Sequence, residues 1–97
     1  MGNDKFEWDE NKNQINIRKH GVSFKVAESV FDDNNALYID DDEHSQEEER
    51  FIVIGRCETQ KILVVCHCYR ENADVIRLIS ARKANKLETD YYCGGVL

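Results

Sequence analysis

Hydrophobic and polar positions follow a helical spacing in the first third of the chain. Residues 10–20 predict a largely polar helix that begins after Asp9 as its N-cap and ends at Gly21, which adopts a left-handed backbone easily. A second helix is expected after Ser23, because apolar side chains recur three and four residues apart and would face the core. These side chains are Phe24, Ala27, Val30 and Phe31. The sequence therefore predicts two N-terminal helices.

From residue 36 onward, the apolar positions alternate with polar ones or form short runs rich in β-branched residues. Four segments show this pattern, which is typical of strands: 36–40, 51–57, 61–69 and 74–80. The gaps between the last three segments have the length of hairpin loops. Strands joined by hairpins pair antiparallel, so the pattern predicts a four-stranded, mainly antiparallel meander.

A helical spacing returns after the fourth predicted strand. Ser80 is its expected N-cap, Gly94-Gly95 its expected end, and its apolar positions are Ala81, Ala84, Leu87 and Tyr91. We therefore expect an α+β fold with two N-terminal helices, the meander sheet and a C-terminal helix, all helices packing on one face of the sheet. A single domain should span residues 6–92, and residues 93–97 should form a tail.

The four cysteines predict neither a disulfide framework nor a metal site. Cys66 and Cys68 would share one face of a strand while His67 points to the other face, and no second pair has zinc-finger spacing. Free cysteines commonly behave as small buried apolar residues. We expect reduced thiols, no metal or other cofactor, and a cytosolic protein without a signal peptide. The longest apolar run, 62–66, is too short to span a bilayer, so no membrane partner is expected.

The net charge of −6 at first argues against a nucleic-acid partner. However, residues 40–49 hold seven carboxylates, and the rest of the chain is slightly positive. A local basic site is therefore compatible with the composition, although long-range attraction of RNA should be weak.

Several cationic side chains are candidates for a chemical role. Arg77 stands in the middle of a predicted strand, where it must pair with an acid, reach water or bind an anion. A structural ion pair with a carboxylate such as Glu88 is the alternative to anion binding. Arg82 follows closely, on the basic side of the predicted C-terminal helix. Two further arginines, one at the start of a strand and one at the end of another, would complete a basic cleft: Arg50 and Arg70.

Lys19 and His20 lie together at the end of the first predicted helix. Cationic side chains there stabilise a helix by capping its last carbonyls, which is the structural interpretation. The chemical one is a general acid or base beside a phosphate ligand. His67 is expected in the core or on the sheet face, and His44, among carboxylates, in solvent.

Several short phrases occur in the order and at the spacing of one known family. They are Phe6-Glu7-Trp8-Asp9, Lys19-His20-Gly21-Val22-Ser23-Phe24, Glu49-Arg50 and Arg77-Leu78-Ile79-Ser80-Ala81-Arg82, followed by Glu88 and Tyr92. Over residues 6–92 the chain resembles the BrnT toxins. It departs from their pattern at Val26, where a capping-box glutamate is typical, and in the unusually acidic segment 40–49.

The resemblance implies a RelE-like endoribonuclease toxin of a type II toxin–antitoxin module, which cleaves RNA and thereby inhibits translation. It also implies neutralisation by a cognate BrnA-like antitoxin that carries a ribbon-helix-helix part. Contact with DNA would then occur only indirectly, through the toxin–antitoxin complex.

RNA cleavage without a metal requires a base for the 2′-hydroxyl, an acid for the leaving 5′-oxygen, and cations for the phosphorane. Under this hypothesis His20 is the acid–base group with Lys19 beside it. Arg77 and Arg82 would clamp the phosphate bidentately, which lysine cannot do. Three further residues would position flanking phosphates or stack on a base: Arg50, Arg70 and Tyr92.

Two other function classes stay open. One is a non-catalytic protein-interaction module, whose arginines hold the sheet to the last helix. The other is a metal-dependent phosphoesterase built on the carboxylates of residues 40–43. Structural arginines should each have a nearby carboxylate, whereas catalytic ones should converge on open space. The nuclease hypothesis also requires that Arg77, Arg82 and His20 meet in one pocket.

Overall fold

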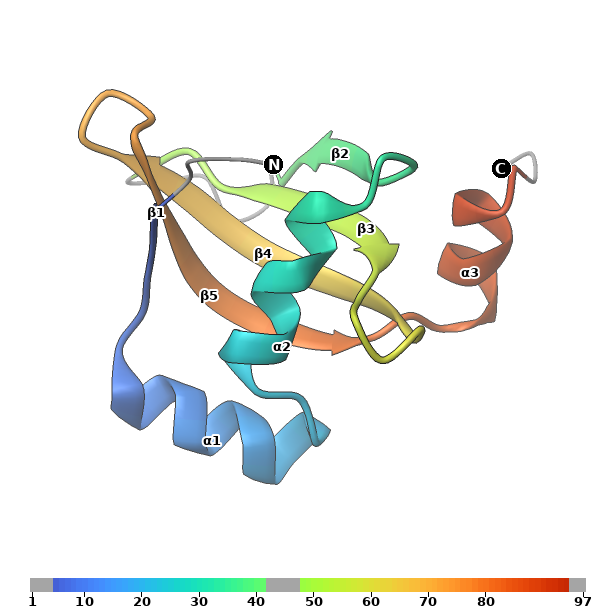
Figure 1. The fold of residues 1–97 in the computed structure, drawn as a ribbon, viewed down its shortest axis with the longest axis horizontal. Coiled ribbons are helices and arrows are strands. Elements are labelled where there is room, and N and C mark those ends of the chain that lie inside the picture. The colour runs from blue at the N-terminus through green and yellow to red at the C-terminus, as the bar shows by residue number, and fades with distance from the viewer. Residues whose placement is uncertain (1–4, 42–47, 95–97) are drawn as a thin grey trace.

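The computed structural model describes residues 5–41 and 48–94, which build a five-stranded sheet with helices packed against it (Figure 1). In chain order the elements are β1 (Lys5–Glu7), α1 (Glu10–His20), α2 (Phe24–Glu28), the 3₁₀ helix η1 (Ser29–Asp32), β2 (Leu37–Asp40), β3 (Phe51–Arg56), β4 (Ile62–Arg70), β5 (Val75–Lys83) and α3 (Lys86–Tyr92). Within these ranges, none of the helices has the length and apolar composition that a membrane crossing demands.

The strands lie in the order β1-β5-β4-β3-β2. The meander from β2 to β5 is antiparallel throughout, as the alternation of apolar residues predicts. The prediction of four strands is wrong, because β1 pairs with β5 in parallel, from Lys5 opposite Val75 to Glu7 opposite Arg77. The sequence indicates a short extended segment at residues 6–8, but three residues are too few for an alternating pattern that would identify a sheet strand or its partner.

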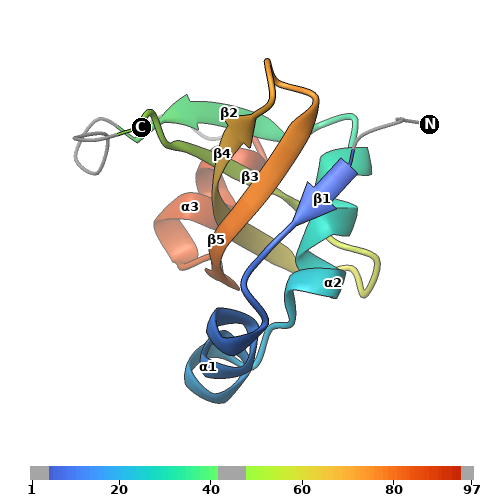
Figure 2. The same ribbon diagram turned by 90° about the vertical axis from the view of Figure 1, so that its left-hand side faces the viewer.

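Helices cover both faces of the sheet, not one as expected (Figures 1 and 2). On the α1–α2 face, which also carries η1, Phe24 and Val30 are fully buried in one cluster with Val53 and Val65. α3 lies on the opposite side, the α3 face, and none of its residues is buried. The main core therefore lies on the α1–α2 face, while Ile54, Val64 and Cys68 are also buried on the α3 face.

The boundary between β5 and α3 differs from the prediction. β5 continues to Lys83, where a helix was expected from residue 81. Ala81 is fully buried and pairs with Val65 of β4, so its small apolar side chain serves strand packing. α3 starts after Asn85, which forms a capping box with Glu88. The basic side predicted for the last helix is consequently wrong, because Arg82 and Lys83 are strand residues.

A β-bulge interrupts the pairing of β4 and β5. Cys66 pairs with Ser80 and His67 pairs with Leu78, which leaves Ile79 as an extra residue in β5. In a regular strand, residues five positions apart point to opposite faces. The bulge shifts this alternation, so that Arg77 and Arg82 pair with Cys68 and Val64 on one face.

Two buried asparagines attach α1 to the remainder of the fold. Asn16 donates its side-chain amide to the carbonyls of Ala81 and Val22, both at 2.8 Å, and accepts from the Ala81 N–H at 3.1 Å. The Asn13 side chain accepts from the N–H of Phe24 at 2.8 Å. These bonds explain why a helix with few apolar residues packs stably along the edge of β5.

Candidate functional site

The α3 face carries a row of arginines contributed by different strands and by the residue before β3: Arg50, Arg70, Arg77 and Arg82. The bulge places the last two on this face together. The four arginines that the sequence analysis assigned to a basic cleft therefore lie on one face of the sheet, and Arg50 and Arg82 line one hollow. The partners of these side chains, however, determine what the cluster can bind.

Carboxylates pair with Arg70, Arg77 and Arg82. Arg77 Nη1 lies 2.9 Å from Glu7 Oε2, its register partner in β1, and Arg70 Nη2 lies 3.2 Å from an oxygen of Glu48. Arg82 binds Glu88 bidentately through contacts of 2.8 and 2.7 Å. Glu88 therefore pairs with Arg82, not with Arg77. By the criterion stated for structural arginines, these side chains have the carboxylate partners that the non-catalytic alternative requires.

The Arg82–Glu88 pair also fixes the start of α3. Glu88 accepts the N–H of Asn85 at 2.9 Å while binding the guanidinium. The hydrogen bonds from Arg82 hold the pKa of the Glu88 carboxyl below its ordinary value, and the same contacts raise the pKa of Arg82. About 43% of the Arg82 side chain is nevertheless exposed, so part of its guanidinium edge faces solvent.

A hollow of about 240 Å³ lies beside this pair on the α3 face. Its charged lining consists of Arg50, Arg82 and Asp41, the last of which is buried and belongs to the acidic segment. Cys66 and Ser80 supply polar atoms. Burial, with a further contribution from Asp41, raises the pKa of the Cys66 thiol to about 11, so this cysteine is protonated at neutral pH and is a poor nucleophile.

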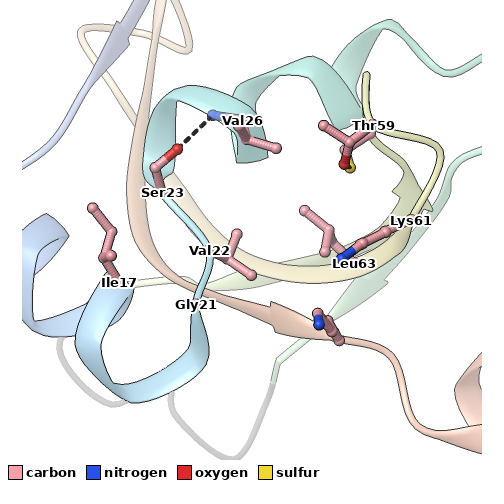
Figure 3. A pocket seen from close by; sticks show the side chains of 10 residues that line it. Ile17, Gly21, Val22, Ser23, Val26, Thr59, Lys61 and Leu63 are labelled. Carbon is pink, nitrogen blue, oxygen red and sulfur yellow. Dashed lines mark hydrogen bonds between the residues drawn. The ribbon is translucent and has the colours of Figure 1, made fainter.

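Lys19 and His20 do not line this arginine hollow. They end α1, and Gly21 follows with a φ of 72° as the C-cap. Residues that directly follow them line a second cavity, between the end of α1 and the sheet (Figure 3). The structure therefore divides the predicted site, with arginines around one hollow and the Lys19-His20 pair beside another. The expectation of a single pocket is not met.

The second cavity, of about 330 Å³, differs from the arginine hollow in its charge. Figure 3 shows Val22, Val26 and Leu63 directed towards its interior. Lys61 and Lys83 are its charged residues, and the lining contains no carboxylate from the described part of the chain. Sequence inspection missed this pair, because the two lysines lie 22 positions apart.

Tyr92 is a hydrogen-bond donor at the end of α3. Its hydroxyl donates to Asp33 Oδ2 at 2.6 Å, and the Arg56 guanidinium lies 5.8 Å from the ring centroid. The bond to Asp33 raises the pKa of Tyr92. Asp33 also accepts the N–H groups of Arg56 and Asn35. The contacts of Tyr92 thus anchor α3 to the turn before β2.

His67 is fully buried, as the sequence predicts for a core histidine. Aromatic rings surround it, including Phe31 at 4.9 Å and Tyr69 at 5.3 Å between ring centroids. Burial lowers its pKa to about 4. The imidazole is therefore neutral at physiological pH and is shielded from an external substrate.

No group of three or more His, Cys, Asp or Glu side chains within residues 5–41 and 48–94 is arranged to hold a metal ion. Two of the carboxylates proposed for the phosphoesterase alternative, at residues 42 and 43, lie outside these ranges. The predicted tail beyond residue 94, including Gly95 as the predicted end of the last helix, lies outside them too.

Comparison with known proteins shows which family the chain belongs to. Residues 8–88 match the family described as the ribonuclease toxin BrnT of type II toxin–antitoxin systems. The chain belongs to the BrnT family. Among solved structures, the ribonuclease toxin BrnT of Brucella abortus is 27% identical, with a TM-score of 0.65 over 86% of this chain and 99% of that one. No curated protein sequence matches the chain. The fold of this BrnT-family chain is therefore α+β, with a five-stranded mixed sheet, and is similar to that of the Brucella abortus toxin.

Proposed function

We propose that this BrnT-family chain cleaves RNA without a metal ion and that a ribbon-helix-helix antitoxin of the BrnA type neutralises it. The family match over residues 8–88 is the observation that carries the proposal. The domain responsible is taken as residues 6–92. Free cysteines throughout the described residues agree with action in the reducing cytosol, where RNA is available. DNA would be contacted only through the antitoxin.

Phosphate binding is assigned to the arginines of the α3 face. Arg82 and Arg50 border the hollow beside Ser80, and Arg77 and Arg70 extend the same face. Partly exposed ion pairs contribute at most about 1 kcal/mol, so a phosphate can replace a carboxylate partner at small cost. A guanidinium offers two parallel N–H donors to phosphate oxygens. Under this proposal Glu88 and Glu7 hold the guanidiniums in place until substrate arrives.

The acid–base role is assigned to His20, with Lys19 beside it. Asn16, one helical turn before His20, is bonded to Ala81 of β5, so this side of α1 faces the end of that strand. Arg82 lines the arginine hollow and its neighbour Lys83 lines the second cavity. An RNA strand that crosses the end of β5 would therefore contact both His20 and Arg82. Tyr92 is kept as a flanking contact through its ring.

The decisive experiment is digestion of purified RNA by the purified chain with and without excess EDTA. Cleavage should persist in EDTA and be lost in His20→Ala and Arg82→Ala, provided that circular dichroism shows both variants folded. Cleavage that requires a divalent ion would overturn the metal-independent mechanism. Wild-type protein that neither cleaves RNA nor arrests bacterial growth more than the variants would favour the interaction-module alternative.

A further inference from the structure

The geometry points to an RNA subsite in the cavity between the end of α1 and the sheet, where Lys61 and Lys83 bind backbone phosphate and the apolar wall receives a base. This inference rests on the proposed function, since it concerns the same substrate. The site is separate from the arginine hollow, and it lies next to Lys19 and His20, which do not line it themselves.

The charge of this cavity is the first argument. Within the described residues, neither Lys61 nor Lys83 forms an ion pair or side-chain hydrogen bond, in contrast to Arg70, Arg77 and Arg82. Two ammonium groups without a carboxylate repel each other, and an anion between them removes the repulsion. Because the chain has a net charge of −6, a cavity with only cations is an exception to its surface.

The register of the strands brings the two lysines together. Lys83 pairs directly with Leu63, and Lys61 comes two residues before Leu63, immediately ahead of β4, and lines the same cavity. Diagonal neighbours of this kind have Cα atoms about 7–8 Å apart, which long side chains can span. Both ammonium groups can therefore reach one phosphate or two successive ones.

The walls suit a nucleobase next to that phosphate. Ile17, Val22, Val26 and Leu63 form the apolar part, and Ser23 and Thr59 add hydroxyl groups at the border (Figure 3). Ser23 accepts the N–H of Val26, which leaves its own O–H available as a donor. A volume of about 330 Å³ lies within the range of small-molecule sites. An apolar wall with a few polar groups binds a base without strict sequence preference.

The test is binding of a short single-stranded RNA, fully 2′-O-methylated so that it cannot be cleaved, followed by fluorescence anisotropy over a range of salt concentrations. Lys61→Gln with Lys83→Gln should weaken binding several-fold at low salt. The slope of log affinity against log salt should become shallower by about 0.7 if the two lysines neutralise one phosphate and by about 1.4 if they neutralise two. Lys12→Gln with Lys25→Gln is the matched control, since both lysines are exposed and line neither cavity.

The apolar wall has its own test. Ile17→Ser should weaken binding while leaving the salt slope unchanged, because no phosphate contact is removed. Ile15→Ser is its control on the same helix, at a position that is 52% exposed and outside the cavity. Equal affinities and slopes for the Lys61/Lys83 and Lys12/Lys25 double variants would overturn the subsite, as would a wild-type chain that fails to bind the probe.

Failure of the proposed function is distinguishable from failure of this inference. Suppose that the wild-type protein does not cleave ordinary RNA but binds the probe, and that only the Lys61/Lys83 variant binds the probe more weakly. The subsite is then supported and the nuclease function is contradicted. If wild type cleaves RNA and the variant binds the probe normally, the subsite alone is wrong.

Discussion

β1 pairs with β5 only as far as Arg77. Further along the same edge of β5, the side-chain amide of Asn16 bonds to the backbone of Ala81. Asn16 accepts from the N–H of Ala81 and donates to its carbonyl, as a neighbouring strand would do. Sequence periodicity treats Asn16 as one more polar position on a polar helix. Its burial arises from the path of the chain after Gly21, which returns the backbone carbonyl of Val22 to the same amide.

We predict that Asn16→Leu destabilises the fold by about 1–3 kcal/mol, because the buried polar groups of Ala81 lose their partners. Urea denaturation measures the change. Gln14→Leu is the control, since Gln14 is exposed and, among the residues that the structure describes, its side chain bonds only to Glu10. A loss in Asn16→Leu no larger than that in Gln14→Leu would contradict the role assigned to the amide.

His67 couples the stability of the core to pH. In the unfolded chain its imidazole takes up a proton near pH 6.5, whereas burial lowers the pKa in the folded state to about 4. The unfolded state therefore binds more protons between these values. Stability is full above about pH 6.5 and falls as the pH drops towards 4.

The predicted slope is about 1.4 kcal/mol per pH unit below the unfolded-state value, or about 3 kcal/mol in total by pH 4. Denaturation series between pH 7 and 5 measure this slope, and subtracting the slope of His67→Phe removes the smaller contribution of carboxylates, which titrate mainly below pH 5. His67→Phe should have no such slope. A wild-type stability that is constant between pH 7 and 5 would show that the imidazole is not buried as a neutral group.

At the scale of elements, the meander was predictable and the devices that orient the arginines were not. β3 and β4 consist largely of apolar residues bounded by hairpins, and such runs identify strands directly. The bulge at Ile79 has no sequence signature, since it is defined only by the pairing with β4. The predicted start of α3 is wrong because Ala81 and Ala84 fit the apolar spacing of a helix as well as they fit their actual positions at the end of β5 and after it. The capping box at Asn85 marks the observed start.

Glu88 is the residue that decides between the structural and RNA-binding roles of Arg82. Glu88→Gln removes the charge of the ion pair, keeps one acceptor oxygen at the start of α3 and replaces the other oxygen with an NH₂ group. If Arg82 binds phosphate, we predict that RNA affinity rises several-fold in this variant while stability falls by less than about 1 kcal/mol. Asp90→Asn makes the same charge change on the same helix, where Asp90 pairs with Lys86. Equal affinities in the two variants would assign Arg82 a structural role alone.

At the scale of the whole molecule, the sequence predicted the cationic residues but not their distribution. Arg50 and Arg82 meet at one hollow as expected, whereas Lys19 and His20 lie beside another cavity. Residue types identify candidate charges, but ion pairing depends on neighbours such as Glu7, which reaches Arg77 only through the parallel strand. The lysine-lined cavity is formed by the loop after α1 together with residues at the start of β4 and the end of β5. Because these segments are far apart in the sequence, no local motif predicts the cavity.

The four thiols report how the molecule as a whole excludes solvent. Cys57 and Cys68 are buried and Cys93 is exposed, while Cys66 is partly covered with a raised pKa. We predict that iodoacetamide at pH 8 labels Cys93 first and the other three only after unfolding in urea. Peptide mass spectrometry gives the order of labelling. Labelling of Cys68 in the native state at the rate of Cys93 would contradict the packing of the α3 face.

The bulge also determines where this chain can change its length. Losing Ile79 would remove the bulge but keep Arg77 opposite Cys68 and Arg82 opposite Val64, on the same face. Gaining one residue between the bulge and Arg82 would instead shift the register, turn Arg82 towards the core and expose Ala81. The hairpin before β5 has no such restriction, because residues 71–74 are exposed and their backbone already takes an irregular left-handed path at Glu71, Asn72 and Ala73. Insertions engineered to carry a tag or a label therefore belong at that hairpin, 5 to 8 residues upstream of a position where a single extra residue would invert the strand.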